Sequence, residues 1–582
     1  MSKKLLLTLV IIVAGFSTAT KAQTVYFNGL GRAIVTNESL SGSILKGDTT
    51  RPDRRGTGGY TLFDLGVNAQ PNEHLRASAI LRIRNEFGGF YGDGSLLNFR
   101  QLRLDGVIAK VVKYEIGDID LALTPYTLFN FDEIYHDYEA DIFAIRRSIV
   151  HYENFNFGNK WRLQGAHGSS NIRFSKGIEK IGLRAFASRT RQNNLLNVPD
   201  RLLFGGRADV VQSKFIQAGV NYIKMADITG TVPDTSFEFN NRVFTIDYRL
   251  TYDNDNIGVA LYGETGFSRY SMFRALDDTT VSKNSSFYDI GLSGEYKPLK
   301  IKLFAQYRYV GYDFSSPGAQ TRRIYDMGRP SIFPNVNNGA IRNPGIFDRY
   351  SDEAGSPLSS STNGEFMRNF TIQPGLMLFN PMYNNITPYG IATPNRQGIT
   401  AGAGFGDVDK VLRGDLKVDV LSEVTGEGTP ETRKFFGIRG GTVLNAGKLL
   451  MWEKLLSVNA GFRLENTNRG GVNPIDFKST LVDAGLNLEI IKNLDIMAGY
   501  KYFSAKGNEF ILGRDAYNSL TGAPIPVDFD LNESILAGGI RYRFSRNTFF
   551  TGQYNMVARN FKNFVDNNYN INQVFLNYTM VF

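Results

Sequence analysis

Residues 481–490 read LVDAGLNLEI and residues 494–502 read LDIMAGYKY, with only residues 491–493 between them. In both stretches apolar and polar side chains alternate, so that Val482 falls on one face and Asp483 on the other. A period of two is the spacing at which successive side chains of a β-strand point to opposite faces. The two stretches and their short connection therefore predict a β-hairpin with one apolar and one polar face.

The same alternation recurs along most of the chain, in segments of about ten to fourteen residues. Soluble β-sandwiches and propellers also alternate, but their strands usually have about five or six residues. Tilted strands that cross a bilayer need roughly 9–11 residues. Tyrosines such as Tyr500 and Tyr502 end the apolar faces, and short connections alternate with long ones. Both features favour an all-β fold, a transmembrane antiparallel β-barrel.

Twenty-three segments carry this pattern, and 144–154, 160–166 and 170–176 are counted among them as three separate strands. A single-chain barrel of this type needs an even number of strands. With both chain ends on one side of the membrane, the missing strand falls between 300–311 and 411–424. We assign it to 366–379 (FMRNFTIQPGLMLF). The expected barrel then has about 24 strands, within a range of about 18–26.

Residues 312–410 form a long irregular insert that is rich in Gly, Pro, Asn and Ser. Long segments without regular structure are usually either functional or disordered. A wide barrel also has a lumen that side chains alone do not fill. We therefore expect 312–365, 380–410 or both to fold into or over the pore. The alternative is that they are disordered external loops.

The composition excludes several other classes of protein. The chain of 582 residues has no Cys, which rules out disulfides, thiolate metal sites and a cysteine nucleophile. Its formal net charge is +9, but basic residues alternate with acidic ones, which argues against nucleic-acid binding. After residue 22 no run of about 18 apolar residues occurs, so we expect no transmembrane helix.

The N-terminus has the layout of a cleavable secretory signal. Lys3 and Lys4 precede the apolar run 5–16, and Ala22 is a small residue at the expected cleavage site. The apolar run would span only about 18 Å as a helix, which is too short for a hydrocarbon core of about 30 Å. We expect residues 1–22 to be a signal peptide and residues 23–582 to be a barrel in the outer membrane.

The last strand reads YNINQVFLNYTMVF and ends the chain at residue 582. Alternate residues of this strand share one apolar face: Val574, Leu576, Tyr578, Met580 and Phe582. This strand resembles the terminal signal strand of bacterial outer-membrane β-barrel proteins. The resemblance implies a porin-like barrel in contact with outer-membrane lipid. It also implies that the barrel-assembly machinery recognises these five residues. No narrower family is indicated.

If the apolar faces meet lipid, the opposite faces line the lumen. The candidates for solute selectivity on those faces carry both signs of charge: Arg308, Arg541, Arg543, Arg463, Lys501, Asp289, Glu295, Asp483 and Glu489. The arginines can attract an anion, and the acids can form the facing wall. The alternative is that these groups form salt bridges that hold the wall rigid.

These features lead to a porin-like channel or facilitated transporter for hydrophilic solutes. The second hypothesis is a plugged barrel that acts as a surface scaffold for a secretion, adhesion or lipoprotein partner, in the periplasm or at the surface. A rim hydrolase would need a pair such as His136 and Asp137, and adjacency in sequence does not supply the geometry. A TonB-dependent receptor would need a plug before the barrel, whereas strand-like sequence begins at Thr24. We expect no enzyme activity, cofactor or metal site.

Overall fold

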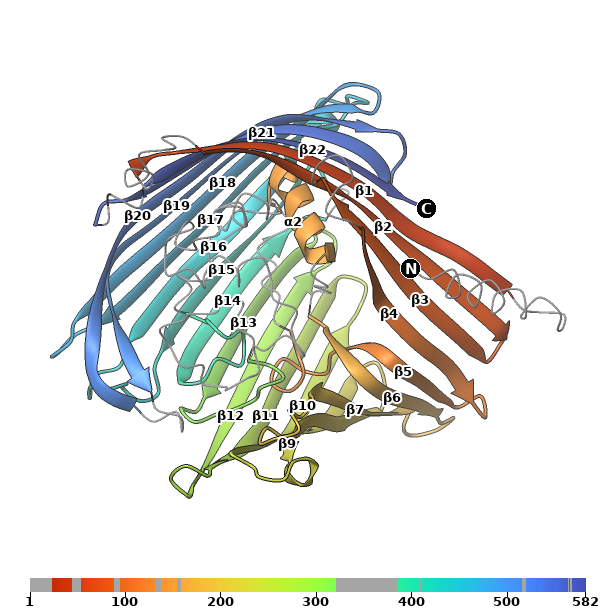
Figure 1. Ribbon diagram of the computed structural model, residues 1–582, viewed down its shortest axis with the longest axis vertical. Coiled ribbons are helices and arrows are strands. Elements are labelled where there is room, and N and C mark those ends of the chain that lie inside the picture. Colours follow the sequence, from red (N-terminus) through yellow and green to blue (C-terminus); the bar gives the residue numbers. More distant parts are fainter. Residues whose placement is uncertain are drawn as a thin grey trace.

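The computed structural model describes residues 24–43, 54–87, 95–130, 138–153, 159–320, 386–407, 410–514, 520–563, 565 and 568–582. Within them 22 strands form one antiparallel sheet that closes on itself (Figure 1). β1 (Thr24–Ser41) pairs with β2 (Arg54–Asn72) on one side and with β22 (Tyr569–Val581) on the other. The predicted closed barrel is confirmed, and its 22 strands lie within the expected range although below the central value of 24.

The other strands pair with their neighbours in chain order, which makes an up-and-down barrel. They are β3 (Leu75–Glu86), β4 (Ser95–Ile108), β5 (Val112–Leu121), β6 (Trp161–Arg173), β7 (Lys180–Arg191), β8 (Asp200–Val211), β9 (Ile216–Ile228), β10 (Phe237–Asp253), β11 (Ile257–Arg274), β12 (Thr279–Tyr296), β13 (Ile301–Val310), β14 (Arg396–Phe405), β15 (Leu412–Ser422), β16 (Lys434–Asn445), β17 (Leu456–Arg469), β18 (Ile475–Ile491), β19 (Leu494–Arg514), β20 (Leu520–Arg543) and β21 (Thr548–Phe561). The short 3-10 turn η3 (Thr229–Thr231) follows β9.

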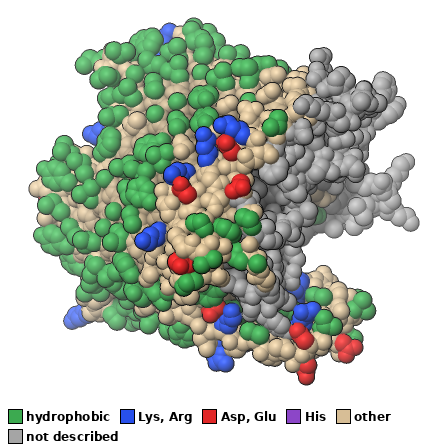
Figure 2. All heavy atoms as spheres, turned by 90° about the vertical axis from the view of Figure 1, so that its left-hand side faces the viewer, with side chains coloured by type: hydrophobic (Ala, Val, Ile, Leu, Met, Phe, Trp, Pro, Cys, Tyr) green, Lys and Arg blue, Asp and Glu red, His purple; other side chains and the backbone are tan. Residues whose placement is uncertain are grey.

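The outer face of the barrel is apolar. On β12 the side chains of Tyr288, Ile290 and Leu292 are 46%, 45% and 54% exposed, whereas Asp289 between them is buried. Hydrophobic side chains cover most of the wall that faces the viewer in Figure 2. No helix in the described part of the chain is long and apolar enough to cross a membrane. An apolar outer band around a closed antiparallel sheet is the architecture of an outer-membrane β-barrel.

The prediction of a strand at 144–154 is wrong, because this part of the chain belongs to the helix α2 (Asp141–Glu153). Ile142, Ile145 and Ile149 follow the helical spacing of three and four residues. Asp141 lies in the first turn, where a negative charge stabilises the helix. The two predicted strands 160–166 and 170–176 are one strand, β6.

The strand that an even count requires is β14, which pairs directly with β13. β14 lies inside the range 312–410, so the prediction that this whole range is an irregular insert is wrong for Arg396–Phe405. Its sequence, RQGITAGAGF, has small residues in place of a strong apolar alternation. The predicted strand 366–379 and the predicted signal peptide 1–22 lie outside the described residues.

Both ends of the barrel chain meet at the end of the barrel that carries the short turns. Phe582 and Gly29 exchange backbone hydrogen bonds of 2.9 and 3.1 Å, and the ring of Phe582 stacks on Phe63. At the opposite end the strands extend further than expected, into residues predicted as loops. Only residues 515–519, for example, lie between the end of β19 and the beginning of β20. The side chains of Val574, Leu576 and Tyr578 lie on the exposed outer face of β22. Recognition of this strand by the assembly machinery stays a prediction.

Because Leu292 is assigned to the lipid-facing side of β12, we predict that Leu292→Arg destabilises the barrel in a bilayer. Leu292 lies between Tyr288 and Tyr296 on the apolar face of β12, where a charge must enter hydrocarbon. We expect the free energy of unfolding to fall by about 2–4 kcal/mol, measured by denaturant titration in lipid vesicles. Ser293→Arg, on the inward face of the same strand, is the matched control and is expected to cost much less. Equal losses in the two variants would contradict the assignment of faces.

Candidate functional site in the lumen

Two connections fold into the barrel instead of away from it. The first joins β5 to β6 and includes residues 122–130 and α2, and the second joins β13 to β14 and includes residues 311–320 and 386–395. Figure 1 shows α2 inside the ring of strands. Tyr126 and Phe314, one from each connection, are each only 1% exposed. The described ends of the predicted insert therefore pack within the barrel, and residues 321–385 lie outside the described part.

We call residues 122–130, 311–320 and 386–395 the inner cluster, because hydrogen bonds join the three segments into one packed body. The hydroxyl of Ser316 donates to the carbonyl of Tyr126 at 2.7 Å. The side-chain amide of Gln320 donates to the carbonyl of Ala392 at 2.8 Å. The indole of Trp161 on β6 donates to the carbonyl of Gly318 at 2.7 Å. These bonds satisfy backbone groups that would otherwise be buried without partners.

The inner cluster is fixed to the wall through two inward-facing acids. The phenol of Tyr126 donates to Asp289 at 2.6 Å, and the hydroxyl of Thr124 donates to Glu264 at 2.6 Å. The ring of Tyr126 also stacks on Phe287 with 4.0 Å between ring centroids. Burial first, and then the charge of Asp289, raise the pKa of Tyr126 well above its usual value. The phenol therefore keeps its proton and remains a donor to Asp289.

α2 runs along the inner wall from one side of the barrel to another. At its beginning Asp141 accepts hydrogen bonds from Asn487 on β18 at 2.7 Å and from Arg541 on β20 at 3.2 Å. In its middle the buried Arg146 donates to Gln573 on β22. Near its end Tyr152 donates to Asp64 on β2 at 2.6 Å. The helix is therefore held by polar contacts at three points of the wall.

Glycines on the wall let the first turn of α2 and the residue before it lie close to the sheet. A Cβ added at Gly485 would lie 2.2 Å from the Cβ of Ala140, and one added at Gly499 would lie 2.7 Å from the ring of Phe143. Real Cβ atoms do not approach other atoms so closely, so a larger residue at either position would push the segment into the lumen.

The structure places all nine predicted selectivity residues on the inward sides of their strands, and each lies within ion-pair distance of an opposite charge. The pairs are Lys501 with Glu139 (3.0 Å) and Asp483 (3.6 Å), Arg541 with Asp495 (2.8 Å), Arg543 with Glu489 (3.1 Å) and Asp495 (2.8 Å), Arg308 with Asp289 (3.9 Å), Lys302 with Glu295 (3.9 Å), and Arg463 with Glu465. Lys501, Asp483 and Arg541 thus form ion pairs of the kind named as the alternative in the sequence analysis, and Lys501 and Arg541 also hold the segment around α2 to the wall. Their role in selectivity stays a prediction.

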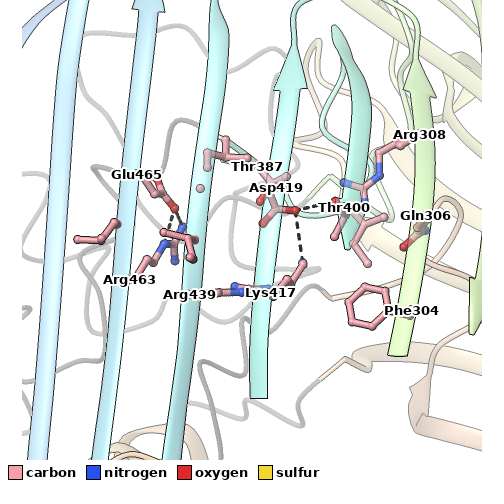
Figure 3. Close-up of a pocket in the computed structure, with 15 residues that line it drawn as sticks. Phe304, Gln306, Arg308, Thr387, Thr400, Lys417, Asp419, Arg439, Arg463 and Glu465 are labelled. Carbon is pink, nitrogen blue, oxygen red and sulfur yellow. Dashed lines mark hydrogen bonds and ion pairs between the residues drawn. The ribbon is translucent and has the colours of Figure 1, made fainter. Parts of the chain in front are cut away.

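Two adjoining cavities lie beside the inner cluster. The smaller, of about 170 Å³, is shown in Figure 3; four basic side chains line it, Arg308, Lys417, Arg439 and Arg463, together with Asp419 beside Lys417 and Glu465 beside Arg463. The larger, of about 470 Å³, lies under Tyr126 on the wall formed by β7 to β12. Gln306 and Ile391 line both cavities and lie between them.

The larger cavity contains two cations that the wall does not neutralise. Lys180 and Arg249 line it, and among the described residues neither lies within ion-pair distance of a carboxylate. Arg207, in contrast, bridges Asp209 at 2.6 Å and Asp247 at 2.5 Å. The sequence analysis did not single out Lys180 or Arg249 as selectivity candidates.

The histidines form no site in the described part of the chain. His74 lies in an exposed turn beside Glu73 at 3.7 Å, and His167 lies 3.8 Å from Glu115. No group of three or more His, Asp or Glu side chains that could hold a metal occurs among the described residues. His136 and Asp137, the pair considered for a rim hydrolase, lie outside them.

No protein-family model matches the chain, and no curated protein matches it. Among solved structures it is similar to Pseudomonas aeruginosa OpdO, with 10% identity over 95% of this chain and 97% of that one and a TM-score of 0.33. A BenF-like porin from Pseudomonas fluorescens Pf-5 has 10% identity over 96% and 99%, with a TM-score of 0.34. The ferric citrate transporter FecA has 8% identity over 95% and 78%, with a TM-score of 0.46. Values this low identify neither a family nor a solute.

The buried pair of Lys501 and Glu139 predicts that Lys501→Met loosens the attachment of α2. The change removes the ammonium group that lies 3.0 Å from Glu139 and 3.6 Å from Asp483, and breaking a buried pair in this way costs about 3–5 kcal/mol. We expect faster amide hydrogen exchange in residues 138–143, measured by mass spectrometry. The triple variant E139Q/D483N/K501M, which removes all three charges, should recover most of the protection. Unchanged exchange in Lys501→Met would show that the pair does not hold the segment.

Proposed function

We propose that the protein is a porin-like channel or facilitated transporter that carries hydrophilic solutes across the outer membrane. The observation that carries the proposal is the pair of adjoining cavities, lined by charged side chains, inside a closed barrel with an apolar exterior. Along such a wall, polar and charged side chains can replace the water molecules around a hydrophilic solute. The hydrocarbon of the bilayer has no groups that can do so. The proposal includes export through the signal 1–22 and insertion through the last strand.

The inner cluster defines the narrow part of the proposed path. It is anchored to Asp289 and Glu264 and lies directly beside the two cavities. A passing solute would meet Lys180 and Arg249 in the larger cavity and Arg308, Lys417, Arg439 and Arg463 in the smaller one. Arg308 and Arg463 are already paired with Asp289 and Glu465, so the preference for solutes that carry negative charge rests on Lys180 and Arg249, which lie within ion-pair distance of no carboxylate among the described residues.

A second candidate function is a plugged barrel that serves as a surface scaffold. The observation that favours it is the attachment of α2, which is tied to β18, β20, β22 and β2 by polar contacts. A helix fixed at several points is suited to blocking a lumen permanently. Steady conducting steps of the purified protein in planar bilayers would favour the channel, and a silent barrel that co-purifies with a partner would favour the scaffold.

The absence of Cys from the chain allows a direct test of the proposed path. Gln306 lines both cavities, so attachment of a charged methanethiosulfonate reagent to Gln306→Cys should lower single-channel conductance in discrete steps. Ala305→Cys is the matched control, because Ala305 is the adjacent residue on β13 and its side chain is exposed on the outer face. Its labelling should leave the conductance unchanged. Equal responses at the two positions would contradict a path along this wall.

The unpaired cations predict the direction of ion selectivity. The variant K180Q/R249Q should shift the reversal potential in a salt gradient toward cation preference, with the anion-to-cation permeability ratio falling at least about twofold. Lys492→Gln removes a cation from the exposed turn between β18 and β19, two strands that line neither cavity, and should have no effect. An unchanged reversal potential in the double variant would show that permeating ions do not pass these two residues.

A further inference from the structure

The connection between β16 and β17 differs from the other turns at its end of the barrel. It comprises residues 446–455 and begins with the short helix α5 (Ala446–Leu449). The connections on either side of it at the same end comprise only residues 406–411 and 492–493. We call residues 446–455 the rim loop.

The rim loop presents four consecutive apolar side chains to its surroundings. Leu449, Leu450, Met451 and Trp452 are 60%, 66%, 94% and 46% exposed. Met451 also adopts a φ of 54°, a conformation that is unfavourable for a residue with a side chain. A cluster of exposed apolar residues in a conformation of this kind is a frequent sign of a binding surface.

Several backbone amides in and beside the loop have hydrogen-bond partners. The amide groups of Leu450, Met451 and Trp452 donate to carbonyls within the loop at 2.9, 3.2 and 2.8 Å. The amide of Asn445 donates to Val411 at 2.7 Å, and the amide of Leu455 donates to Glu489 at 3.2 Å. Because these amides have partners, the tip can enter a medium of low polarity without leaving them unpaired.

The surroundings of the loop are those of a membrane interface. Outward-facing residues of the adjacent strands are exposed and apolar, so the loop continues the lipid-facing band; they are Leu412, Val458, Ile490 and Ile491, at 45%, 41%, 40% and 56%. Two lysines flank the tip, and the ammonium group of Lys454 lies 5.9 Å from the centroid of the Trp452 ring. The ammonium group of Lys454 also donates to the carbonyl of Ile490, which places the charge at the rim, the level at which lysines contact lipid phosphates while their stems stay on apolar surface.

We propose that the rim loop inserts Leu449, Leu450, Met451 and Trp452 into the phospholipid leaflet on the periplasmic side and anchors this edge of the barrel. The occupant of the apolar surface is therefore lipid, with Lys448 and Lys454 at the level of the phosphates. The periplasmic side follows from the short turns and the chain ends, which lie at this end of the barrel. The proposal holds whether the lumen conducts or is closed.

The chain has two tryptophans, which makes the test specific. Trp161 is 2% exposed inside the barrel, so the difference in fluorescence between the native protein and Trp452→Phe reports Trp452 alone. In phosphatidylcholine vesicles we expect lipids brominated near the headgroup to quench this signal strongly, and aqueous acrylamide to quench it weakly. The variant L449S/L450S/M451S should reverse the two responses.

Leu196→Trp in the background W161F/W452F provides the matched control, because Leu196 is 71% exposed in a loop at the opposite end of the barrel. Its fluorescence should be quenched by acrylamide and not by brominated lipid. The same behaviour at Trp452 would overturn the proposal. Shielding of Trp452 from acrylamide in native membranes but not in pure lipid vesicles would also overturn it, since a protein partner would then cover the loop.

Discussion

The structure depends on one constraint, which is that no backbone N–H or C=O group can face hydrocarbon without a partner. The pairing of β1 with β22 meets this constraint, because it removes the two free edges that the sheet would otherwise have. Closure with antiparallel neighbours also requires an even number of strands and brings Gly29 and Phe582 to the same end. The constraint does not apply inside the lumen, so irregular segments such as the inner cluster can lie there.

The charged side chains on the inward face of the closed barrel also need partners where they are buried. Lys501 is only 2% exposed, and its charge is compensated by Glu139 from the segment before α2 as well as by Asp483 from the wall. Charges used in this way hold the interior in place and cannot also bind a solute. Lys180 and Arg249 are not used in this way, which is why the proposed selectivity is assigned to their region of the wall.

The sequence predicts a strand well where one of its faces contacts lipid and the other faces the polar lumen. β18 and β19 show this alternation over residues 482–490 and 494–502, whereas Gly165 and Gly168 interrupt it in β6 and small residues hide it in β14. The sequence suggests a strand in place of α2 because the buried side of the helix includes Arg146, which weakens its apolar stripe. Inward faces could be predicted for the site residues, but their partners could not. Lys501 and Glu139 are 362 positions apart, and no local pattern connects them.

The length of the β19–β20 hairpin determines what an approaching particle meets first. The two strands have 21 and 24 residues, although about 9–11 tilted residues are enough to cross the bilayer. At about 3.3 Å per residue, the remaining half of the hairpin reaches roughly 20 Å beyond the lipid surface even when it is tilted. On the cell exterior this rigid arm would be touched by an antibody or a phage fibre before either could reach the mouth of the barrel.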